Sequence, residues 1–304
     1  KMKTQHLFLL GLMYCLVSCG PNKSDLEALA PTENYPQDTF LASAEKKKAL
    51  VVVAHDDDLV GMAGTISRLN QQGWEVKEIC FISEGEARDK ALVEAAGVIM
   101  DGVEFISIAP EKRRNDLKPE DAPYMPIPKE KFATAFNRVE IEQALLQKIN
   151  AFEPTVIFSM DNEMGGYGHP EHILVSQLLV DWYNSGAIKP ARIYQTVYPN
   201  SMEDKIIKQR LSKLLEEWGA PNSYLTATKM YNLSGMPEPT VEINIQDQSE
   251  NKMKFLRSFL ERERQTIAFF IPHFEDFDHE EYFGVFDREF FRVIEKSNAK
   301  AASL

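Results

Sequence analysis

The sequence has few cysteines and a deficit of basic side chains. Only 3 of its 304 residues are Cys. Cys15 and Cys19 lie near the start, so the rest of the chain can form no internal disulfide and depends on its core, or on a metal, for stability. Cys80, in an apolar segment, is predicted to be a small core residue. The chain has 34 Lys and Arg against 46 Asp and Glu, a formal net charge of −12. No dense basic stretch interrupts this, which argues against nucleic acid as a partner.

The beginning of the chain resembles a bacterial export signal. A basic start precedes an apolar run over residues 7–17 that is too short to span a bilayer. Residues 16–19, Leu-Val-Ser-Cys, resemble the lipobox of lipoproteins, in which the cysteine carries two acyl chains. We therefore predict a signal peptide over residues 1–18, lipid attachment at Cys19 and a location at the bacterial cell envelope. The polar stretch over residues 19–45 predicts a flexible tether. An ordinary cleaved signal, with the cysteine incidental, is the alternative.

Residues 46–304 are enough for one α/β domain. Residues 49–54 form a continuous apolar run, which is typical of a strand buried on both faces of a parallel sheet. Further predicted strands cover residues 76–83, 105–108, 155–160, 191–197 and 240–245, and predicted helices cover residues 61–72, 86–100, 129–151, 170–183, 203–218 and 248–269. A long loop of charges and prolines over residues 110–128 interrupts the alternation. The pattern predicts a Rossmann-like three-layer αβα fold with a mostly parallel sheet.

Four polar residues, His55, Asp56, Asp57 and Asp58, follow the first predicted strand. Three adjacent carboxylates repel one another unless a cation offsets their charge. Carboxylate oxygens together with an imidazole suit zinc or another divalent ion. Ligands of open α/β sheets bind beyond the carboxyl ends of the strands. The cluster therefore predicts a metal site, with a solvated run of surface charges as the alternative.

A second cluster, Gly-Gly-Tyr-Gly-His-Pro-Glu-His over residues 165–172, follows the strand predicted at residues 155–160. Its glycines allow the backbone unusual torsions and close approach to a ligand. Pro170 suits the first turn of a helix, so His172 projects from the start of that helix and His169 lies just outside it. Because both clusters follow strands of one sheet, we expect the histidines to face the first cluster across the sheet edge.

Together the two clusters resemble the PIG-L/LmbE-like family of zinc-dependent deacetylases, which includes N-acetylglucosaminyl-phosphatidylinositol deacetylases. That family combines His-x-Asp-Asp after a strand with Gly-x-His-Pro-(Asp/Glu)-His about a hundred residues later. Residues 83–86, Ser-Glu-Gly-Glu, stand where the family has Thr-Asp-Gly-Glu, and residues 94–97 are similar to its Glu-x-x-x-Ala-x-x-Leu-Gly helix. The resemblance is good over residues 47–175 and loose afterwards.

The resemblance implies a role for each matching residue. His55, Asp58 and His172 would be the ligands of one zinc ion per chain, or of another divalent metal. Asp57 would be the general base, and His169, in its protonated form, would donate to the oxyanion. Three protein ligands leave a position open for water, whose pKa zinc lowers to about 7.

Two residues depart from the family pattern. Asp56 replaces a proline that fixes the turn, and Leu59 replaces a glutamate that is a candidate for orienting a metal ligand. Substrate binding is predicted for Glu84, Arg88 and Tyr167. An exposed helix arginine is the alternative for Arg88.

The resemblance thus implies a metal-dependent N-deacetylase that acts on an N-acetylglucosamine-type sugar or glycoconjugate, with the membrane contacted through the lipid anchor. Two alternatives remain open. One is an amidase for a larger N-acyl group or a conjugate amide, which would need an enlarged apolar pocket. The other is a non-catalytic lipoprotein that binds a sugar or a metal. A nucleotide-binding fold is disfavoured, because no Gly-x-Gly-x-x-Gly follows the first strand.

Overall fold

The centre of the protein is a seven-stranded sheet. The computed structural model describes residues 20–83, 85–106 and 122–296. The strands are β1 (Lys48–Val53), β2 (Glu75–Cys80), β3 (Gly102–Phe105), β4 (Val156–Met160), β5 (Arg192–Thr196), β6 (Val241–Asn244) and β7 (Arg288–Glu295). Their order is β3-β2-β1-β4-β5-β7-β6. The strands from β3 to β5 are parallel, and β7 is antiparallel to β5 and β6. This confirms the predicted α/β fold with a mostly parallel sheet.

Strand β1 lies inside the sheet because both of its faces are apolar. It pairs with β2 on one side and with β4 on the other, so that Val51 lies opposite both Glu78 and Phe158. Val51 and Val53 contribute to the core on one face of the sheet, while Leu50 and Val52 contribute to the core on the other face. The continuous apolar run seen in the sequence is therefore the consequence of two-sided burial.

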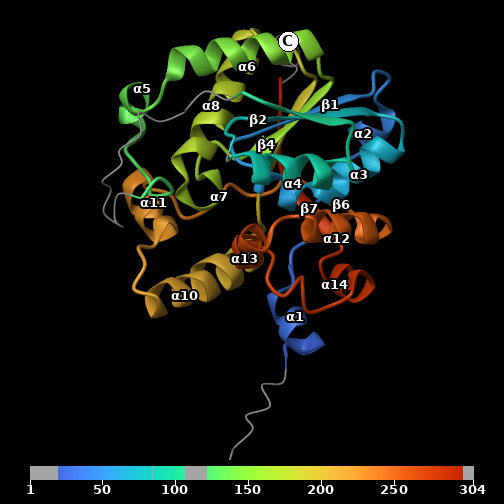
Figure 1. Ribbon diagram of the computed structural model, residues 1–304, viewed down its shortest axis with the longest axis vertical. Helices are drawn as coiled ribbons and strands as arrows, with labels where there is room; N and C mark the ends of the chain where they lie inside the picture. Colours follow the sequence, from blue (N-terminus) through green and yellow to red (C-terminus); the bar gives the residue numbers. More distant parts are fainter. Residues whose placement is uncertain (1–19, 84, 107–121, 297–304) are drawn as a thin grey trace, which may run out of the picture.

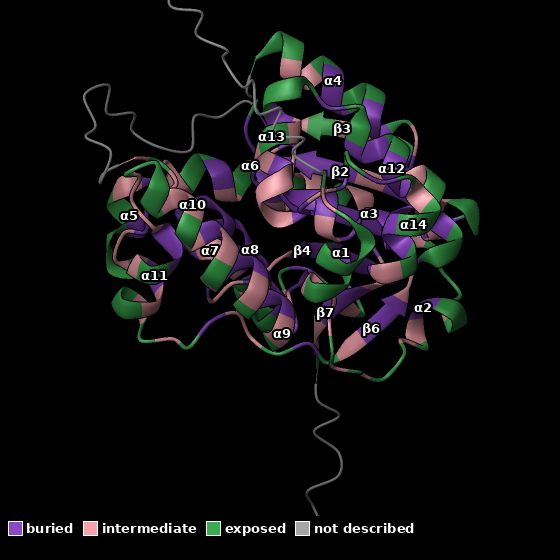
Figure 2. Ribbon diagram, turned by 90° about the horizontal axis from the view of Figure 1, so that it is seen from below, coloured by how far each residue is buried: buried purple, intermediate pink, exposed green. Residues whose placement is uncertain are grey.

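Helices cover both faces and complete the three predicted layers. Helices α6 (Arg138–Phe152) and α8 (Pro170–Ser185) lie on one face (Figure 1). Helices α3 (Ala63–Gln71), α4 (Glu86–Ala96) and α12 (Ser249–Arg257) lie on the other face. Their inner surfaces are buried and their outer surfaces are exposed (Figure 2), as the amphipathic spacing of their apolar residues requires.

The remaining helices are short and surround the ends of the sheet. They are α1 (Lys23–Leu29), α2 (Phe40–Ser43), η1 (Asp58–Gly61), η3 (Lys129–Lys131), α5 (Phe132–Ala135), α7 (Gly165–Gly168), α9 (Asn200–Met202), η4 (Glu203–Leu211), α10 (Ser212–Glu217), α11 (Ser223–Tyr231), η5 (Gln246–Gln248), α13 (Glu261–Phe270) and α14 (His279–Val285). In the described part of the chain, no helix has the length and apolar character needed to cross a bilayer.

Two predicted helices are interrupted, and one strand was not predicted. The helix predicted over residues 129–151 breaks at Phe136, whose backbone is extended and whose ring is buried. The helix predicted over residues 248–269 is divided into α12 and α13 by residues 258–260. Strand β7 escaped prediction because consecutive residues are buried along its first half, which removes the alternation that marks a half-buried strand.

The flexible tether predicted over residues 19–45 is corrected for residues 20–45, which pack against the domain. A capping box starts α1, and Leu26 within this helix has no exposed surface. Further along, the backbone N–H of Tyr35 donates to Glu242 Oε2 over 3.0 Å. The polar composition of the segment concealed the few apolar and hydrogen-bonding residues that hold it to the domain.

The order of the strands creates a crevice between β1 and β4. From β1 the chain runs outward through β2 and β3, and then returns to β4 on the other side of β1. The connections that leave β1 and β4 therefore go to opposite faces of the sheet. Open α/β sheets bind ligands at such a point, beyond the carboxyl ends of the strands. Both polar clusters of the sequence follow these two strands.

Candidate active site

A turn fixed by Asp58 positions the first cluster. Its Oδ2 accepts hydrogen bonds from the backbone N–H groups of Ala54 (3.0 Å) and His55 (2.8 Å). Burial by itself would raise the pKa of Asp58, but the imidazoles of His172 and His55 outweigh it and lower this pKa well below its usual range. The turn therefore presents His55 beside an ionised carboxylate.

The second cluster stands on a loop that Asp161 organises. Oδ1 of Asp161 accepts from the backbone N–H groups of Glu163 (3.0 Å) and Met164 (2.6 Å), and Oδ2 accepts from Gly166 (2.8 Å). The Asp161 side chain is fully buried. Sequence reasoning missed this residue. An aspartate at the end of a strand and before a glycine loop was the only available signal, because such residues bond the backbone that follows.

Three glycines of this loop have positive φ angles, which glycine adopts readily because it has no Cβ atom. The φ angles are +56° at Gly165, +74° at Gly166 and +96° at Gly168. A Cβ atom on Gly168 would lie 2.5 Å from that of Ala227, so no other residue fits without a shift. Pro170 then starts α8, as predicted.

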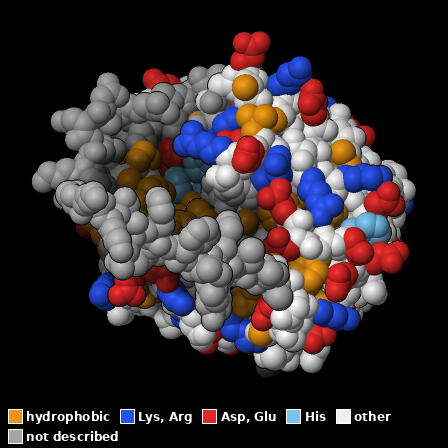
Figure 3. Space-filling model, turned by 60° about the horizontal axis from the view of Figure 1, so that its bottom comes forward, with side chains coloured by type: hydrophobic (Ala, Val, Ile, Leu, Met, Phe, Trp, Pro, Cys, Tyr) orange, Lys and Arg blue, Asp and Glu red, His pale blue; other side chains and the backbone are white. Residues whose placement is uncertain are grey.

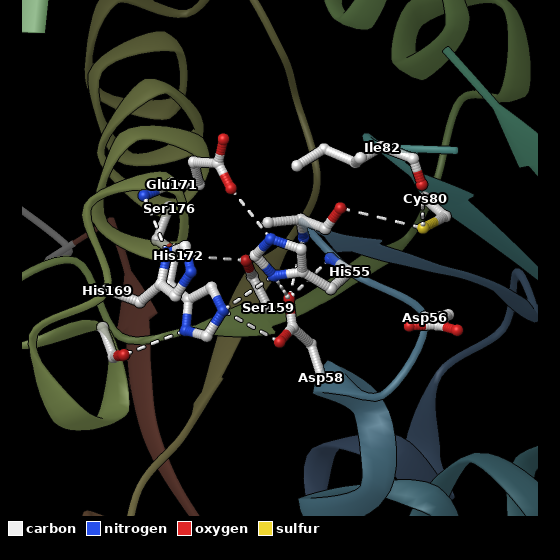
Figure 4. A network of polar contacts seen from close by, with 12 residues as sticks. His55, Asp56, Asp58, Cys80, Ile82, Ser159, His169, Glu171, His172 and Ser176 are labelled. Carbon is white, nitrogen blue, oxygen red and sulfur yellow. Dashed lines mark hydrogen bonds and ion pairs between the residues drawn. The ribbon is translucent and has the colours of Figure 1, made fainter. Parts of the chain in front are cut away.

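The loops bring three predicted ligands together (Figure 4). His55 Nδ1 lies 3.0 Å from His172 Nε2. Asp58 contributes Oδ1 at 2.9 Å from His172 Nε2 and Oδ2 at 3.5 Å from His55 Nδ1. Ligand atoms bound tetrahedrally to zinc at 2.0–2.1 Å stand about 3.3 Å apart. The three side chains thus have the separation of a metal-ligand triangle.

The outer nitrogens of the two imidazoles test whether this donor set fits a metal. His55 Nε2 lies 2.8 Å from Glu171 Oε2, and His172 Nδ1 lies 3.0 Å from the carbonyl oxygen of Gly165. A carboxylate and a carbonyl only accept, so in the neutral imidazoles these outer nitrogens carry the protons. The inner nitrogens, 3.0 Å apart, then present lone pairs to each other. Two lone pairs at this distance repel unless a cation lies between them, so the donors fit a divalent metal.

The charges around His55 point the same way. Burial would lower the pKa of its imidazole, but the carboxylates of Asp58 and Glu171 outweigh burial and raise this pKa well above its usual range. The site therefore attracts positive charge, which a proton or a metal ion can supply.

His169 lies directly against the two facing histidines. Its ring stacks on that of His172 with centroids 4.4 Å apart. Its Nδ1 accepts from the backbone N–H of Glu171 at 3.3 Å, which leaves the ring proton on Nε2. Burial, followed by the neighbouring imidazoles of His172 and His55, lowers the pKa of His169 well below its usual range. These surroundings favour a neutral imidazole that can donate through Nε2, and the protonated form expected from the sequence stays a prediction.

The cluster offers two ligand sets that share His55 and His172. Nitrogen atoms of His55, His169 and His172 all lie within 4.8 Å of one another, so three histidines could hold a metal. The oxygens of Asp58, at 2.9 Å and 3.5 Å from the shared histidines, are the closer third ligand. These shorter separations favour Asp58 over His169.

Asp57 stands beside the ligands and faces a pocket. Burial, followed by the charges of Asp58 and Asp56, raises its pKa to about 6. A carboxylate with a pKa near neutrality can accept and return a proton close to the operating pH, which is the property of a general acid–base group.

Asp56, which replaces the family's proline, is turned away from the ligands (Figure 4). Arg88 Nε lies 2.9 Å from its Oδ2, and Arg88 Nη2 contacts its Oδ1. The same Nε lies 3.4 Å from Glu263 Oε1. Bidentate pairing of this kind compensates the buried charge of Asp56. Substrate binding by Arg88 stays a prediction, and the structure gives this guanidinium a protein partner.

Glu171 supplies the carboxylate that Leu59 lacks for orienting a metal ligand. Leu59 is fully buried in the core, whereas Glu171 holds the outer nitrogen of His55. Carboxylates in this position fix the tautomer and orientation of a metal-binding histidine. Sequence reasoning assigned no role to Glu171, although its place between Pro170 and His172 was the available signal.

Of the other residues singled out in the sequence, two lie in the described part of the chain and two lie outside it. Tyr167 lines the pocket and stacks on Phe270, with ring centroids 4.9 Å apart. Cys80 is buried, as predicted. Glu84 and Cys19 lie outside the described residues.

A pocket opens beside the cluster, with about 80 Å³ of space for the centres of water-sized molecules. One end is formed by Asp57, Asp58 and His172. Its other walls are mostly apolar and are formed by Val60, Met160, Tyr167, Val197, Met236 and Phe270. Figure 3 looks into a hollow with histidine side chains at its bottom and hydrophobic side chains next to them. A single water molecule needs about 10–15 Å³ of such space, so the pocket has room for a group of several non-hydrogen atoms.

Comparison with known families agrees with this geometry. Residues 50–183 match the family model described as PIG-L: GlcNAc-PI de-N-acetylase, and the match contains both polar clusters. This part of the chain belongs to the PIG-L family, and the protein is an enzyme of the deacetylase class. Comparison with curated proteins gave no match.

Several solved structures have a similar fold. N,N'-diacetylchitobiose deacetylase from Pyrococcus horikoshii is 20% identical, with a TM-score of 0.45 over 83% of this chain and 85% of that chain. The 4-carboxy-2-hydroxymuconate hydratase GalB from Pseudomonas putida is 14% identical, with a TM-score of 0.48 over 84% and 100%. A deacetylase of teicoplanin biosynthesis is 11% identical, with a TM-score of 0.48 over 83% and 100%. At these identities the likeness concerns the overall fold alone.

Proposed function

We propose that this protein is a zinc-dependent hydrolase that removes the N-acetyl group from an N-acetylglucosamine-type sugar or glycoconjugate. One zinc ion per chain would be held by His55, Asp58 and His172. The observation that carries the proposal is the pair of imidazole nitrogens 3.0 Å apart, each with its outer nitrogen held by an acceptor. The sugar substrate follows from the description of the matching family.

The residues around this set have the properties that amide hydrolysis needs. When bound, zinc supplies Lewis acidity, which lowers the pKa of water and polarises the amide carbonyl. Asp57, with its pKa raised to about 6, is suited to take a proton from the attacking water and to pass it to the departing amine. His169 is suited to donate its Nε2–H to the oxyanion, since its Nδ1 is occupied by a backbone N–H. Glu171 and the Gly165 carbonyl keep both imidazoles oriented.

The experiment that tests this function combines a metal assay with acetate release. Purified protein loaded with zinc is incubated with N-acetylglucosamine and its glycosides, and the acetate released is measured. Asp57→Asn should lower the rate about 10²–10⁴-fold and should retain zinc, because Asp57 is not among the proposed ligands. Asp181→Asn, on the exposed surface of α8, is the matched control and should behave as the wild type.

The possible results separate the alternatives. Acetate release that depends on Asp57 supports the hydrolase. One bound zinc per chain with no turnover on a panel of amides would instead support a non-catalytic binding protein, and the hydrolase proposal would then fail.

For its location, we propose lipid attachment at Cys19 and exposure at a bacterial cell envelope. The proposal depends on the lipobox-like residues 16–19 alone. Expression of the full chain in bacteria fed a labelled fatty acid tests it. Label should enter the wild type and should be lost in Cys19→Ala; equal labelling of both would refute the attachment site.

A further inference from the structure

The apolar part of the active-site pocket has no role in removing an acetyl group. Hydrolysis of an acetyl amide needs the polar end with Asp57, Asp58 and His172, and room for one methyl group. A methyl group is about the size of a water molecule, whose centre needs roughly 10–15 Å³ of cavity space. The pocket offers about 80 Å³ of such space. Most of its space therefore lies beyond what the acetyl group uses.

A second, largely apolar cavity adjoins the first. It offers about 50 Å³ of space for the centres of water-sized molecules, and the two cavities share Gly61, Thr196, Val197, Tyr198 and Phe270 as wall residues. Its own walls are largely aliphatic and aromatic and include Met202, Ile206, Ile271, Phe283 and Phe286. The apolar space thus continues away from the catalytic carboxylates.

The polar groups of these walls are already used within the protein. The hydroxyl of Tyr198 donates to the carbonyl of Phe270 over 2.7 Å. The hydroxyl of Tyr282, in the second cavity, donates to the carbonyl of Pro272 over 3.0 Å. The charged residues of this cavity are also paired: Lys252 with Glu289, and Arg288 with Glu242. A sugar ring placed here would lose hydrogen bonds to water without replacement, which is costly. An alkyl chain would lose none.

We infer that this enzyme also removes acyl groups longer than acetyl and prefers them, and that their alkyl chains lie in these two cavities. The inference rests on the proposed amide hydrolysis and specifies its substrate. The carbonyl must lie at the polar end, near Asp57 and His172. The substrate part that continues into the apolar space is then the acyl chain, because the amine side carries the hydroxyls of the sugar. Acetyl amides are the smallest substrates of a series whose better members carry longer linear chains.

A series of glucosamine amides with acetyl, butanoyl, hexanoyl and octanoyl groups tests the inference on the zinc-loaded protein. Each buried methylene contributes a transfer free energy that corresponds to about a fourfold change in kcat/KM. We expect kcat/KM to rise from acetyl through hexanoyl. Binding of the matching free carboxylates, from acetate to octanoate, is measured by calorimetry and should tighten with chain length in the same way.

Two variants locate the chain. Val197→Phe, in the wall shared by both cavities, should reduce the ratio of hexanoyl to acetyl turnover at least tenfold. Met202→Trp, in the second cavity, should affect octanoyl more than butanoyl. Val139→Phe, on the exposed surface of α6, is the matched control and should leave the profile unchanged. Thermal unfolding verifies that each variant folds, and the wild-type series remains decisive if one does not.

Failure of this inference is distinguishable from failure of the proposed function. If acetyl amides are the best substrates and carboxylate affinity does not increase with length, the inference is overturned while the hydrolase stands. If no amide is cleaved but carboxylate affinity increases with length, the hydrolase is overturned, and the apolar cavities are supported only as a binding site for alkyl chains.

Discussion

His55 Nδ1 and His172 Nε2 lie 3.0 Å apart, although 117 positions separate the two residues in the sequence. The contact depends on the pairing of β1 with β4, which brings the loops after both strands to one crevice. Glu171 and the carbonyl of Gly165 fix the rings so that the two lone pairs meet. The folded protein therefore maintains an arrangement that is unfavourable without a cation and favourable with one.

The identity of the third metal ligand is the first prediction. His172→Ala and Asp58→Ala should weaken zinc binding more than about 100-fold, a larger loss than removal of an outer hydrogen-bond partner causes. His169→Ala should retain zinc with less than about a tenfold loss, because the Asp58 oxygens lie closer to the shared histidines. Competition with a chromophoric chelator measures the affinities. Loss of zinc in His169→Ala together with retention in Asp58→Ala would show that the three-histidine set is the correct one.

The second prediction concerns Arg88 and Asp56. Arg88→Met leaves the buried Asp56 carboxylate without its guanidinium partner and should lower the free energy of unfolding by about 2 kcal/mol. This loss is smaller than for a fully buried pair, because Arg88 is partly exposed. The double variant Asp56→Asn/Arg88→Met should recover part of the loss. Urea unfolding of the wild type, the two single variants and the double variant gives the coupling energy. If Arg88→Met keeps its stability and instead raises KM for the sugar amide, Arg88 has the substrate role predicted from the sequence.

The third prediction concerns the loop that carries His169. Gly168→Ala should destabilise the protein by about 3 kcal/mol, because φ is +96° and the new Cβ would approach that of Ala227. Gly284→Ala is the matched control: its site in α14 has open space and no positive φ. This control should stabilise the protein by about 0.5–1 kcal/mol. Equal midpoints of denaturant unfolding for the two variants would contradict the packing described for Gly168.

The fourth prediction is a pH dependence of stability that comes from Glu78. This β2 side chain is fully buried, and neither carboxylate oxygen has a hydrogen-bond partner in the described part of the chain. Burial, together with the charges of Asp56 and Asp58, raises its pKa well above the usual range. Between the unfolded and the folded pKa, the unfolded chain binds fewer protons at this group than the folded protein does. Stability therefore decreases as pH rises through this window.

Replacement of Glu78 by methionine tests this dependence. Glu78→Met should raise the free energy of unfolding by about 2 kcal/mol above the window and should change it little in acid. Glu75→Met, at the exposed start of the same strand, is the control. Urea unfolding over a pH series supplies the measurement. A Glu78→Met curve parallel to that of the wild type would mean that Glu78 does not titrate differently on folding.

Much of the fold followed from local pattern. The buried β1 run, the alternation of strands and helices, and Pro170 at the start of α8 are properties of short segments, and each is present in the structure. Prediction from short segments failed where the residues that bury an element come from distant parts of the chain. Leu26 and β7 are examples, since their partners lie far away in the sequence and leave no periodic trace.

The sequence by itself determined which chemical groups stand at the ends of β1 and β4, because a strand that is apolar on both faces must be central and must deliver the residues after it to the sheet edge. Only the tertiary structure decided which partner each of these groups has and how its charge is affected. Glu171 contacts the outer nitrogen of His55, Arg88 pairs with Asp56 away from the ligand cluster, and burial with two neighbouring imidazoles lowers the pKa of His169. Those outcomes depend on burial and on partners from other elements, and the spacing of residues along a chain specifies neither.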